Sequence, residues 1–201
     1  MARTSTTRRV QSGRRTQAER RAESRQAVLD SALKIFGDKG YANTSLEEIA
    51  ADSGLTIRPI YHYFGNKKAL FAAANEIMEQ RIVDSMRVGE SGVGLADNWR
   101  AYLDLCDDPA FRRIVLIDGP VVLGRERWAN SPVTLKARNS LGKVSTRSRA
   151  GEFRGELIQR VMMAAFTEAA LCVAEAKDIA AAKREAQRTM TRLFASLGEL
   201  S

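Results

Sequence analysis

The chain has 201 residues, of which 44% are hydrophobic, and its formal net charge is +8. This length suits one large helical domain or two small ones, and the hydrophobic content supports a packed core. The positive charge suits a polyanionic partner such as nucleic acid, although it also fits simple solubility. No run of ~18 apolar residues occurs, so the sequence predicts no membrane span.

Side chains suited to catalysis or metal binding are sparse. Cys106 and Cys172 both lie inside apolar helical patterns, which favours buried free thiols over a redox switch. His62 is the only histidine, so there is no zinc spacing, and any hydrolytic triad would have to use that residue. Neither a phosphate-binding P-loop nor a dinucleotide fingerprint occurs. We therefore predict no enzyme activity, no metal and no cofactor.

The N-terminal segment is rich in arginine. Residues 3–25 hold eight arginines, six of them in three Arg-Arg pairs, against Glu19 and Glu23. Almost no large apolar side chain precedes Val28, so we predict a disordered basic arm over residues 1–24. Such an arm can lie along phosphates or enter the minor groove of DNA. A solubilising tail is the alternative.

The next segment predicts three short helices. Apolar residues spaced as on one helix face run from Val28 to Phe36, and Gly40 ends that helix. Ser45 is placed to cap a second helix, with Glu48 completing a capping box.

A glycine turn separates the second helix from the third. Gly54 can take a positive φ there without a Cβ clash. Thr56 is placed to cap the third helix, and Pro59 falls in its first turn, where a missing N–H is harmless. Ile60 and Phe64, at i and i+4, are predicted to face inward. Two short helices joined by such a turn predict a helix-turn-helix, whose second helix enters the major groove.

The motif positions resemble the DNA-binding domain of TetR-type transcriptional regulators over about residues 25–78. The matching residues are Phe36, Gly40, Thr44, Ile49-Ala50, Gly54, Tyr61 to Phe64, and Lys67 to Leu70. The sequence departs at Ser53, where the family usually has alanine, and at Thr56–Pro59, where Ser-x-Gly is more common. The second departure alters which bases are read and leaves the fold intact. Ile117–Trp128 also resembles a stretch of some C-terminal domains of the family.

The expected DNA contacts follow from side-chain chemistry and from this resemblance. We expect Arg58 to bind a guanine O6 and N7, and its neighbours to make base-edge or thymine-methyl contacts. Hydroxyl, imidazole and ammonium donors are expected on phosphates, with Lys67 also near a helix N-terminus. The predicted DNA-binding residues are Thr44, Ser45, Thr56, Ile57, Arg58, Pro59, Tyr61, His62 and Lys67.

The rest of the chain predicts further helices. A long fourth helix begins near Asn66, a break follows at residues 89–94, and a fifth helix carries the stripe from Trp99 to Cys106. Asp108-Pro109 begins a sixth helix, which Gly119-Pro120 is predicted to end or kink. Residues 130–151 are basic and aperiodic, which predicts a loop with at most a short helix; a second DNA-binding patch is the alternative.

The last two helices predict an association surface. Between Val161 and Ala174 the only charge is Glu168, and a helix apolar on every face must be buried on every face. Asp178 caps the final helix and Gly198 ends it. TetR-type proteins dimerise through a four-helix bundle of such helices, which implies an interface at Ala165, Ala169, Met190, Leu193, Phe194 and Leu197. In a monomer both helices would serve one core.

The resemblance also implies a small-molecule effector that changes the spacing of two recognition helices. Aromatic and methionine side chains suit an apolar ligand. The candidate pocket residues are Trp99, Tyr102, Phe111, Trp128, Met162, Phe166 and Glu168, and each is equally compatible with an ordinary core.

We therefore expect an all-α chain of about nine helices. Residues 25–70 would form the helix-turn-helix domain and residues 71–201 a helical effector-binding and dimerisation domain. The expected function is a cytoplasmic, nucleoid-associated regulator, a repressor by family default. Its partners would be double-stranded DNA with a palindromic operator, a second copy, and a small apolar effector that releases the DNA. The alternative is a sequence-tolerant DNA-coating protein relying on the basic arm.

Overall fold

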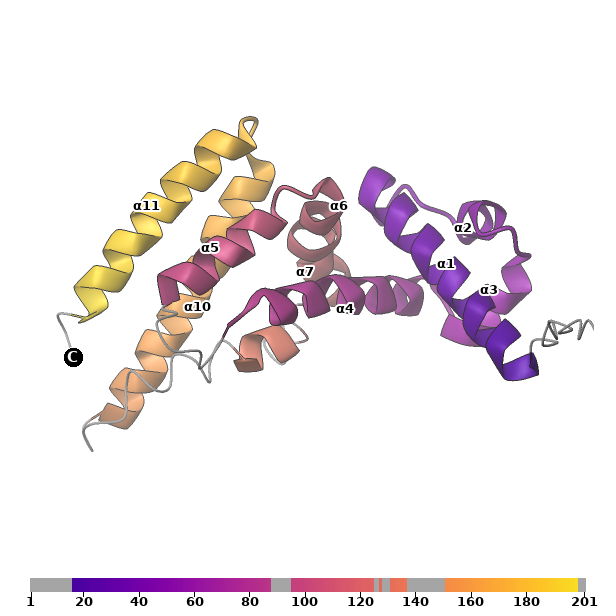
Figure 1. The fold of residues 1–201 in the computed structure, drawn as a ribbon, viewed down its shortest axis with the longest axis horizontal. Helices are drawn as coiled ribbons and strands as arrows, with labels where there is room; N and C mark the ends of the chain where they lie inside the picture. The colour runs from indigo at the N-terminus through magenta and orange to yellow at the C-terminus, as the bar shows by residue number, and fades with distance from the viewer. Residues whose placement is uncertain (1–15, 88–94, 125–126, 128–130, 137–150, 199–201) are drawn as a thin grey trace, which may run out of the picture.

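The computed structural model describes residues 16–87, 95–124, 127, 131–136 and 151–198. Every regular element in these ranges is a helix, which confirms the all-α prediction (Figure 1). None of the helices in the described ranges is long and apolar enough to cross a membrane. In Figure 1, α1, α2 and α3 gather at one end, α10 and α11 lie at the other, and α4 runs between the two groups.

The first helix, α1 (Gln17–Lys39), begins earlier than predicted. The Glu19 N–H donates to the Thr16 hydroxyl at 3.2 Å, and the Thr16 N–H donates to the Glu19 carboxylate at 2.6 Å. This capping box satisfies backbone groups at the helix start. The predicted disorder of residues 1–24 is therefore wrong for residues 17–24, and residues 1–15 lie outside the described ranges. As predicted, α1 ends at Gly40, which has a φ of 77°.

The helix-turn-helix consists of α2 (Leu46–Asp52) and α3 (Ile57–Phe64), packed on α1. Their core is formed by fully buried side chains such as Phe36, Ile49 and Ile60. The Phe36 and Phe71 rings meet edge to face with centroids 5.1 Å apart, which joins α1 to the next helix.

The fourth helix, α4 (Lys67–Ser85), is shared by both halves of the molecule. It begins where predicted, and Asn66 caps it by accepting from the Ala69 N–H at 2.8 Å. One end of α4 packs on α1 and α3, and its remainder packs on the helical segments between residues 95 and 123. Leu70, Phe71 and Ile82 are fully buried along it.

A nearly continuous helical segment follows α5 (Leu95–Leu105). It comprises α6 (Pro109–Phe111), the π-helix η1 (Arg112–Asp118) and α7 (Gly119–Leu123). Asp108 caps α6 as predicted, accepting from the Ala110 N–H at 2.9 Å. As predicted, a helix boundary falls at Gly119-Pro120: η1 ends at Asp118 and α7 begins at Gly119. Pro120 lies in the first turn of α7, where its missing N–H is tolerated.

The last two helices are α10 (Gly151–Glu175) and α11 (Ile179–Gly198), which pack on each other, while α11 also packs on α5. Asp178 caps α11 as predicted, accepting from the Ala181 N–H at 2.9 Å. Within the predicted loop, residues 132–136 are helical and residues 137–150 lie outside the described ranges. The predicted break at 89–94 lies outside them too.

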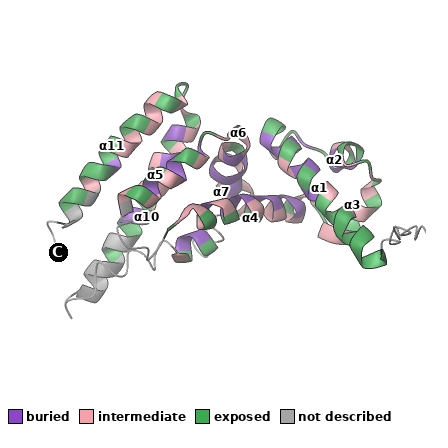
Figure 2. Ribbon diagram, viewed as in Figure 1, coloured by how far each residue is buried: buried purple, intermediate pink, exposed green. Residues whose placement is uncertain are grey.

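Burial along α10 is uneven (Figure 2). Its side chains at Leu157 and Val161 are 49% and 55% exposed in the single chain. Cys106 is buried as predicted, but the prediction that Cys172 is buried is wrong, because α10 turns it outward. The outward face of α10 therefore exposes large apolar side chains together with the charged residue Glu168.

Candidate nucleic-acid interface

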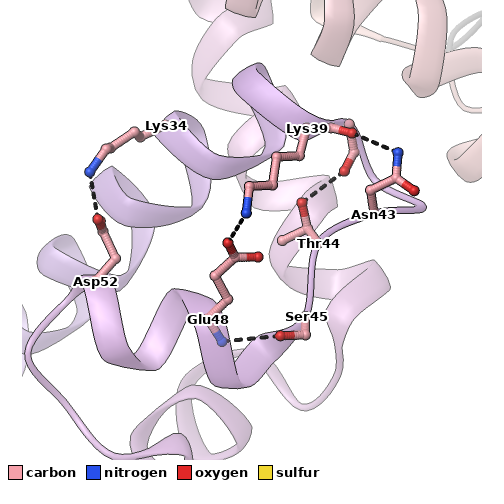
Figure 3. Close-up of polar contacts among 8 residues, drawn as sticks. Lys34, Lys39, Asn43, Thr44, Ser45, Glu48 and Asp52 are labelled. Carbon is pink, nitrogen blue, oxygen red and sulfur yellow. Dashed lines mark hydrogen bonds and ion pairs between the residues drawn. The ribbon is translucent and has the colours of Figure 1, made fainter.

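The start of α2 is held by one half of the predicted capping box. The Glu48 N–H donates to the Ser45 hydroxyl at 3.1 Å. The Glu48 carboxylate instead accepts from Lys39 of α1 (Figure 3). The predicted return bond from Glu48 to the Ser45 backbone is therefore wrong, because a cation of α1 competes for the carboxylate. Ser45 remains exposed, with its hydroxyl hydrogen available to a phosphate.

Further polar contacts fix α2 against α1. Lys34 and Asp52 form an ion pair at 2.5 Å, which lowers the pKa of the Asp52 carboxyl and raises that of Lys34. The Thr44 hydroxyl donates to the Gly40 carbonyl at 2.7 Å (Figure 3). Thr44 is only 3% exposed. Its predicted phosphate contact is therefore wrong for this structure, because the hydroxyl ties α1 to the loop before α2.

The turn between α2 and α3 uses glycine as predicted. Gly54 has a φ of 69°, and the Leu55 N–H donates to the Ala50 carbonyl at 3.0 Å. Thr56 occupies the N-cap position of α3, but the prediction that its hydroxyl caps the helix is wrong: it makes no such hydrogen bond. Thr56 is exposed. Its hydroxyl is thus positioned at the start of the candidate recognition helix without a capping role.

The outward face of α3 carries three of the predicted DNA-binding residues. Arg58, Tyr61 and His62 are exposed and recur at helical spacing on one side. The opposite side holds Ile60, which is fully buried as predicted. Arg58 therefore projects from a rigid helix whose inner face is fixed in the core.

Two residues predicted to contact bases, and the aromatic residue Phe64, are less exposed to a DNA partner. Ile57 and Pro59 are half-buried, and Ile57 packs against the core. Phe64 is also half-buried, with the Arg25 guanidinium 5.2 Å from its ring centroid. The exposed surface of α3 thus centres on Arg58, with partial contributions from its neighbours.

Lys67 lies at the first position of α4, as its predicted phosphate role requires. Its ammonium group is 4.4 Å from the centroid of the Tyr41 ring. This cation–π contact restricts where the charge lies.

Four of the predicted effector residues form an aromatic cluster. Trp99 lies 5.2 Å from Phe166 and 5.7 Å from Tyr102, and Tyr102 lies 6.2 Å from Phe111, measured between ring centroids. Met162 is also buried. The inclusion of Glu168 is wrong, because its side chain is exposed. Trp128 lies outside the described residues.

Sequence reasoning missed a polar group in the same region. Arg127 donates to Asn75 at 3.0 Å and to Glu79 at 3.2 Å, and Asn75 donates to the Ile114 carbonyl at 3.1 Å. Burial raises the pKa of the Glu79 carboxyl, and Arg127 opposes that rise. Asn75 and Glu79 recur at i and i+4 among the apolar positions of α4, and this spacing could have revealed them.

The residues predicted to form the dimer interface differ in their exposure in the single chain. Ala165, Ala169 and Leu193 are half-buried, whereas Met190 is 3% exposed and belongs to the chain's own core. Met190 therefore offers a partner no free surface. The side chains of Phe194 and Leu197 lie outside the described set.

Within the described ranges, no group of three or more His, Cys, Asp or Glu side chains could hold a metal ion.

The arrangement of α1, α2 and α3, with an exposed arginine on α3, defines a helix-turn-helix DNA-binding protein with a second helical domain. The model of bacterial regulatory proteins of the tetR family matches residues 28–74, and the tetracyclin repressor-like C-terminal domain matches residues 93–197. The second match alone covers more than half of the chain. The protein therefore belongs to the TetR family of transcriptional regulators.

Individual relatives agree with this assignment. The HTH-type transcriptional regulator AcrR of Shigella flexneri is 43% identical over 60 residues, which cover 30% of this chain and 28% of AcrR. The match thus spans little more than a quarter of that relative. The transposon Tn10 TetC protein of Escherichia coli is 23% identical over 165 residues, covering 77% of this chain and 82% of TetC.

A solved structure extends the likeness to both domains. A TetR-family transcriptional regulator from Pectobacterium atrosepticum is 28% identical with a TM-score of 0.65, covering 89% of this chain and 95% of that one.

Proposed function

We propose that the chain is a repressor that binds a palindromic operator as a homodimer and leaves it when a small molecule binds the C-terminal domain. The observation that carries the DNA-binding half of this proposal is the exposed face of α3. Arg58, Tyr61 and His62 offer donors outward, while Ile60 anchors the helix within the core. A rigidly held arginine is suited to bidentate recognition of guanine in the major groove.

The homodimer is supported by the outward face of α10. Leu157 and Val161 are about half-exposed there, and Cys172 faces outward on the same helix. Apolar side chains on an outward helix face favour a partner of similar chemistry. A dimer would set two copies of α3 about one DNA turn apart, ~34 Å, to read two half-sites.

Release by an effector is supported by α4. This helix begins beside the helix-turn-helix and continues along the aromatic cluster, so both regions depend on its position. A ligand changes DNA affinity only if it binds the two spacings of the recognition helices unequally. Repression, rather than activation, is favoured by the repressor-like C-terminal domain.

The test is selection of bound duplexes from a random DNA pool at ~150 mM salt, a concentration that weakens non-specific binding. We expect an enriched palindrome. Binding without enrichment would contradict operator recognition and favour the alternative, a DNA-coating protein that relies on its basic N-terminal segment.

Two variants then separate base reading from phosphate binding. Arg58→Ala should cost about 1–3 kcal/mol and relax one operator position. Lys67→Ala should weaken binding to all sequences alike and reduce the salt dependence. Arg100→Ala, which removes one exposed charge from α5, is the matched control and should change neither. An unchanged sequence preference in Arg58→Ala would remove this residue from base reading.

A further inference from the structure

Three buried side-chain polar atoms lack hydrogen-bond partners within the described residues. One is Oε1 of Gln187 on α11, and the other two lie on two helices that pack together. These two are Oε2 of Glu79 on α4 and Nε1 of Trp99 on α5. Glu79 is 2% exposed and Trp99 is 1% exposed. Native proteins leave few such groups unsatisfied, because each loses its hydrogen bonds to water on burial and gains nothing in return. The Glu79 acceptor and the Trp99 donor are therefore buried without a hydrogen-bond partner inside the C-terminal domain.

Both atoms belong to one region of the core. Helices α4 and α5 pack together, and the Tyr102 and Phe166 rings lie beside Trp99. Burial raises the pKa of Tyr102, and the nearby Cys106 and Glu79 raise it further when they are ionised. Glu79 thus lies within electrostatic range of Tyr102, one ring of the aromatic cluster.

Among the described residues, the buried Glu79 carboxylate already has one cationic partner. The Nη1 atom of Arg127 lies 3.2 Å from Oε1 of Glu79 and 3.0 Å from Oδ1 of Asn75. An added ammonium group would leave an unmatched positive charge, and an added carboxylate a second negative one. A buried charge without a partner is strongly disfavoured. A neutral hydrogen-bonding group avoids both penalties.

We infer that the effector is a neutral, largely apolar molecule whose hydroxyl or amide group donates to Glu79 Oε2, and which also accepts from the Trp99 N–H. This inference rests on the proposed effector function of the C-terminal domain and specifies its ligand class. Binding would act directly on α4, because Glu79 lies one turn from Asn75, whose amide holds α4 to η1 through the Ile114 carbonyl.

The test uses three probes with equal numbers of non-hydrogen atoms and different charge: 3-phenylpropanol, 3-phenylpropylamine and phenylacetate. Binding to the full chain is measured by titration calorimetry. We expect the alcohol to bind about tenfold more tightly than either ion, since each ion adds an unmatched buried charge. Equal or tighter binding of either ion, or no binding of the alcohol, overturns the inference.

Variants locate the site. Trp99→Phe keeps an aromatic ring and removes the donor, so it should weaken alcohol binding about three- to tenfold, the worth of a neutral hydrogen bond. Glu79→Gln should also weaken it, and Glu76→Gln, the same change at an exposed position of α4, should not. Alcohol binding unchanged in Trp99→Phe overturns the inference. Circular dichroism checks that both variants fold. If Glu79→Gln does not fold, because Arg127 loses its partner, the binding result for Trp99→Phe alone tests the inference.

The same samples separate this inference from the proposed function. Release of the DNA duplex enriched in the selection experiment above is measured alongside probe binding. If the alcohol binds with the expected charge and variant pattern but releases no DNA, the ligand class stands and effector-controlled release fails. If 3-phenylpropylamine or phenylacetate releases DNA and the alcohol does not, release stands and the inferred ligand class fails.

Discussion

Gly37 makes the tightest contact between the DNA-binding helices and the C-terminal domain among the glycines of the described residues. A Cβ added there would lie 2.5 Å from the Cβ and 3.0 Å from the Cα of Ala110 in α6. Carbon atoms normally approach to about 3.5–4.0 Å. Gly37→Ala would therefore force α1 and α6 apart by about 1 Å, because the obstacle includes backbone that cannot rotate away.

Two opposing effects decide the sign of this substitution. Alanine in place of glycine in a helix contributes about 1 kcal/mol of stability. Overpacking a close interface costs about 1–3 kcal/mol, and a backbone obstacle favours the upper part of that range. We expect a net loss of about 1 kcal/mol, which lowers Tm by about 2–4 °C for a chain of this size. DNA affinity should also fall, since α1 supports both α2 and α3.

Thermal unfolding and DNA titration of three proteins test this reasoning: the parent, Gly37→Ala, and Gly37→Ala combined with Ala110→Gly. The double variant removes the opposing methyl group and should recover part of the lost stability. An increase in Tm for Gly37→Ala alone would refute the argument, because helix propensity would then outweigh the contact.

Two further predictions concern titratable groups. Partial burial of Asp108 opposes its ionisation, but hydrogen bonds from Arg81 and from two backbone N–H groups of α6 lower its pKa. The stability that Asp108 contributes is present above the ordinary aspartate pKa of 3.8 and is lost as the pH falls through the lowered value. Asp108→Ala should thus lower the free energy of unfolding by about 1 kcal/mol at neutral pH, and Asp108→Asn by less, because asparagine still caps the helix. Neither variant should lose much stability in strong acid. Urea unfolding that shows an equal loss at neutral and at strongly acidic pH would contradict this. Burial raises the pKa of the Cys106 thiol to about 11, so in native protein it should react slowly with an aromatic disulfide reagent while the exposed Cys172 reacts first. If α10 pairs with a second copy, labelling of Cys172 should slow as protein concentration rises, and a rate independent of concentration would argue against that face.

The starts of α4, α6 and α11 were predictable because capping is local. Asn66, Asp108 and Asp178 each accept from an N–H two or three residues along the chain, so the cap and its partner lie within one short stretch of sequence. The apolar spacing of α1 and α4 was equally informative, since one helix face determines which residues enter the core.

Predictions failed where a side chain had a choice between a local and a distant partner. Glu48 could close its own cap, yet it pairs with Lys39 on another helix. Thr44 could face DNA, yet its hydroxyl binds Gly40. Such competition depends on three-dimensional packing, which local spacing does not specify.

The candidate effector region illustrates the same limit on a larger scale. Aromatic side chains indicated where a pocket could lie, but the polar groups that select a ligand were missed. Arg127 reaches Glu79 from 48 residues away in the sequence, so the charge balance of this region emerges only once α4 and the segment after α7 are packed together.

The continuity of α4 has a mechanical consequence. With a rise of about 1.5 Å per residue, the axis from Glu79 to Lys67 is a lever about 18 Å long. A tilt of ~10° about the Glu79 end would displace the Lys67 end by roughly 3 Å, close to the rise of one DNA base pair, ~3.4 Å. A movement too small to disrupt the core at one end of this helix is therefore large enough to shift a DNA-reading helix out of register at the other.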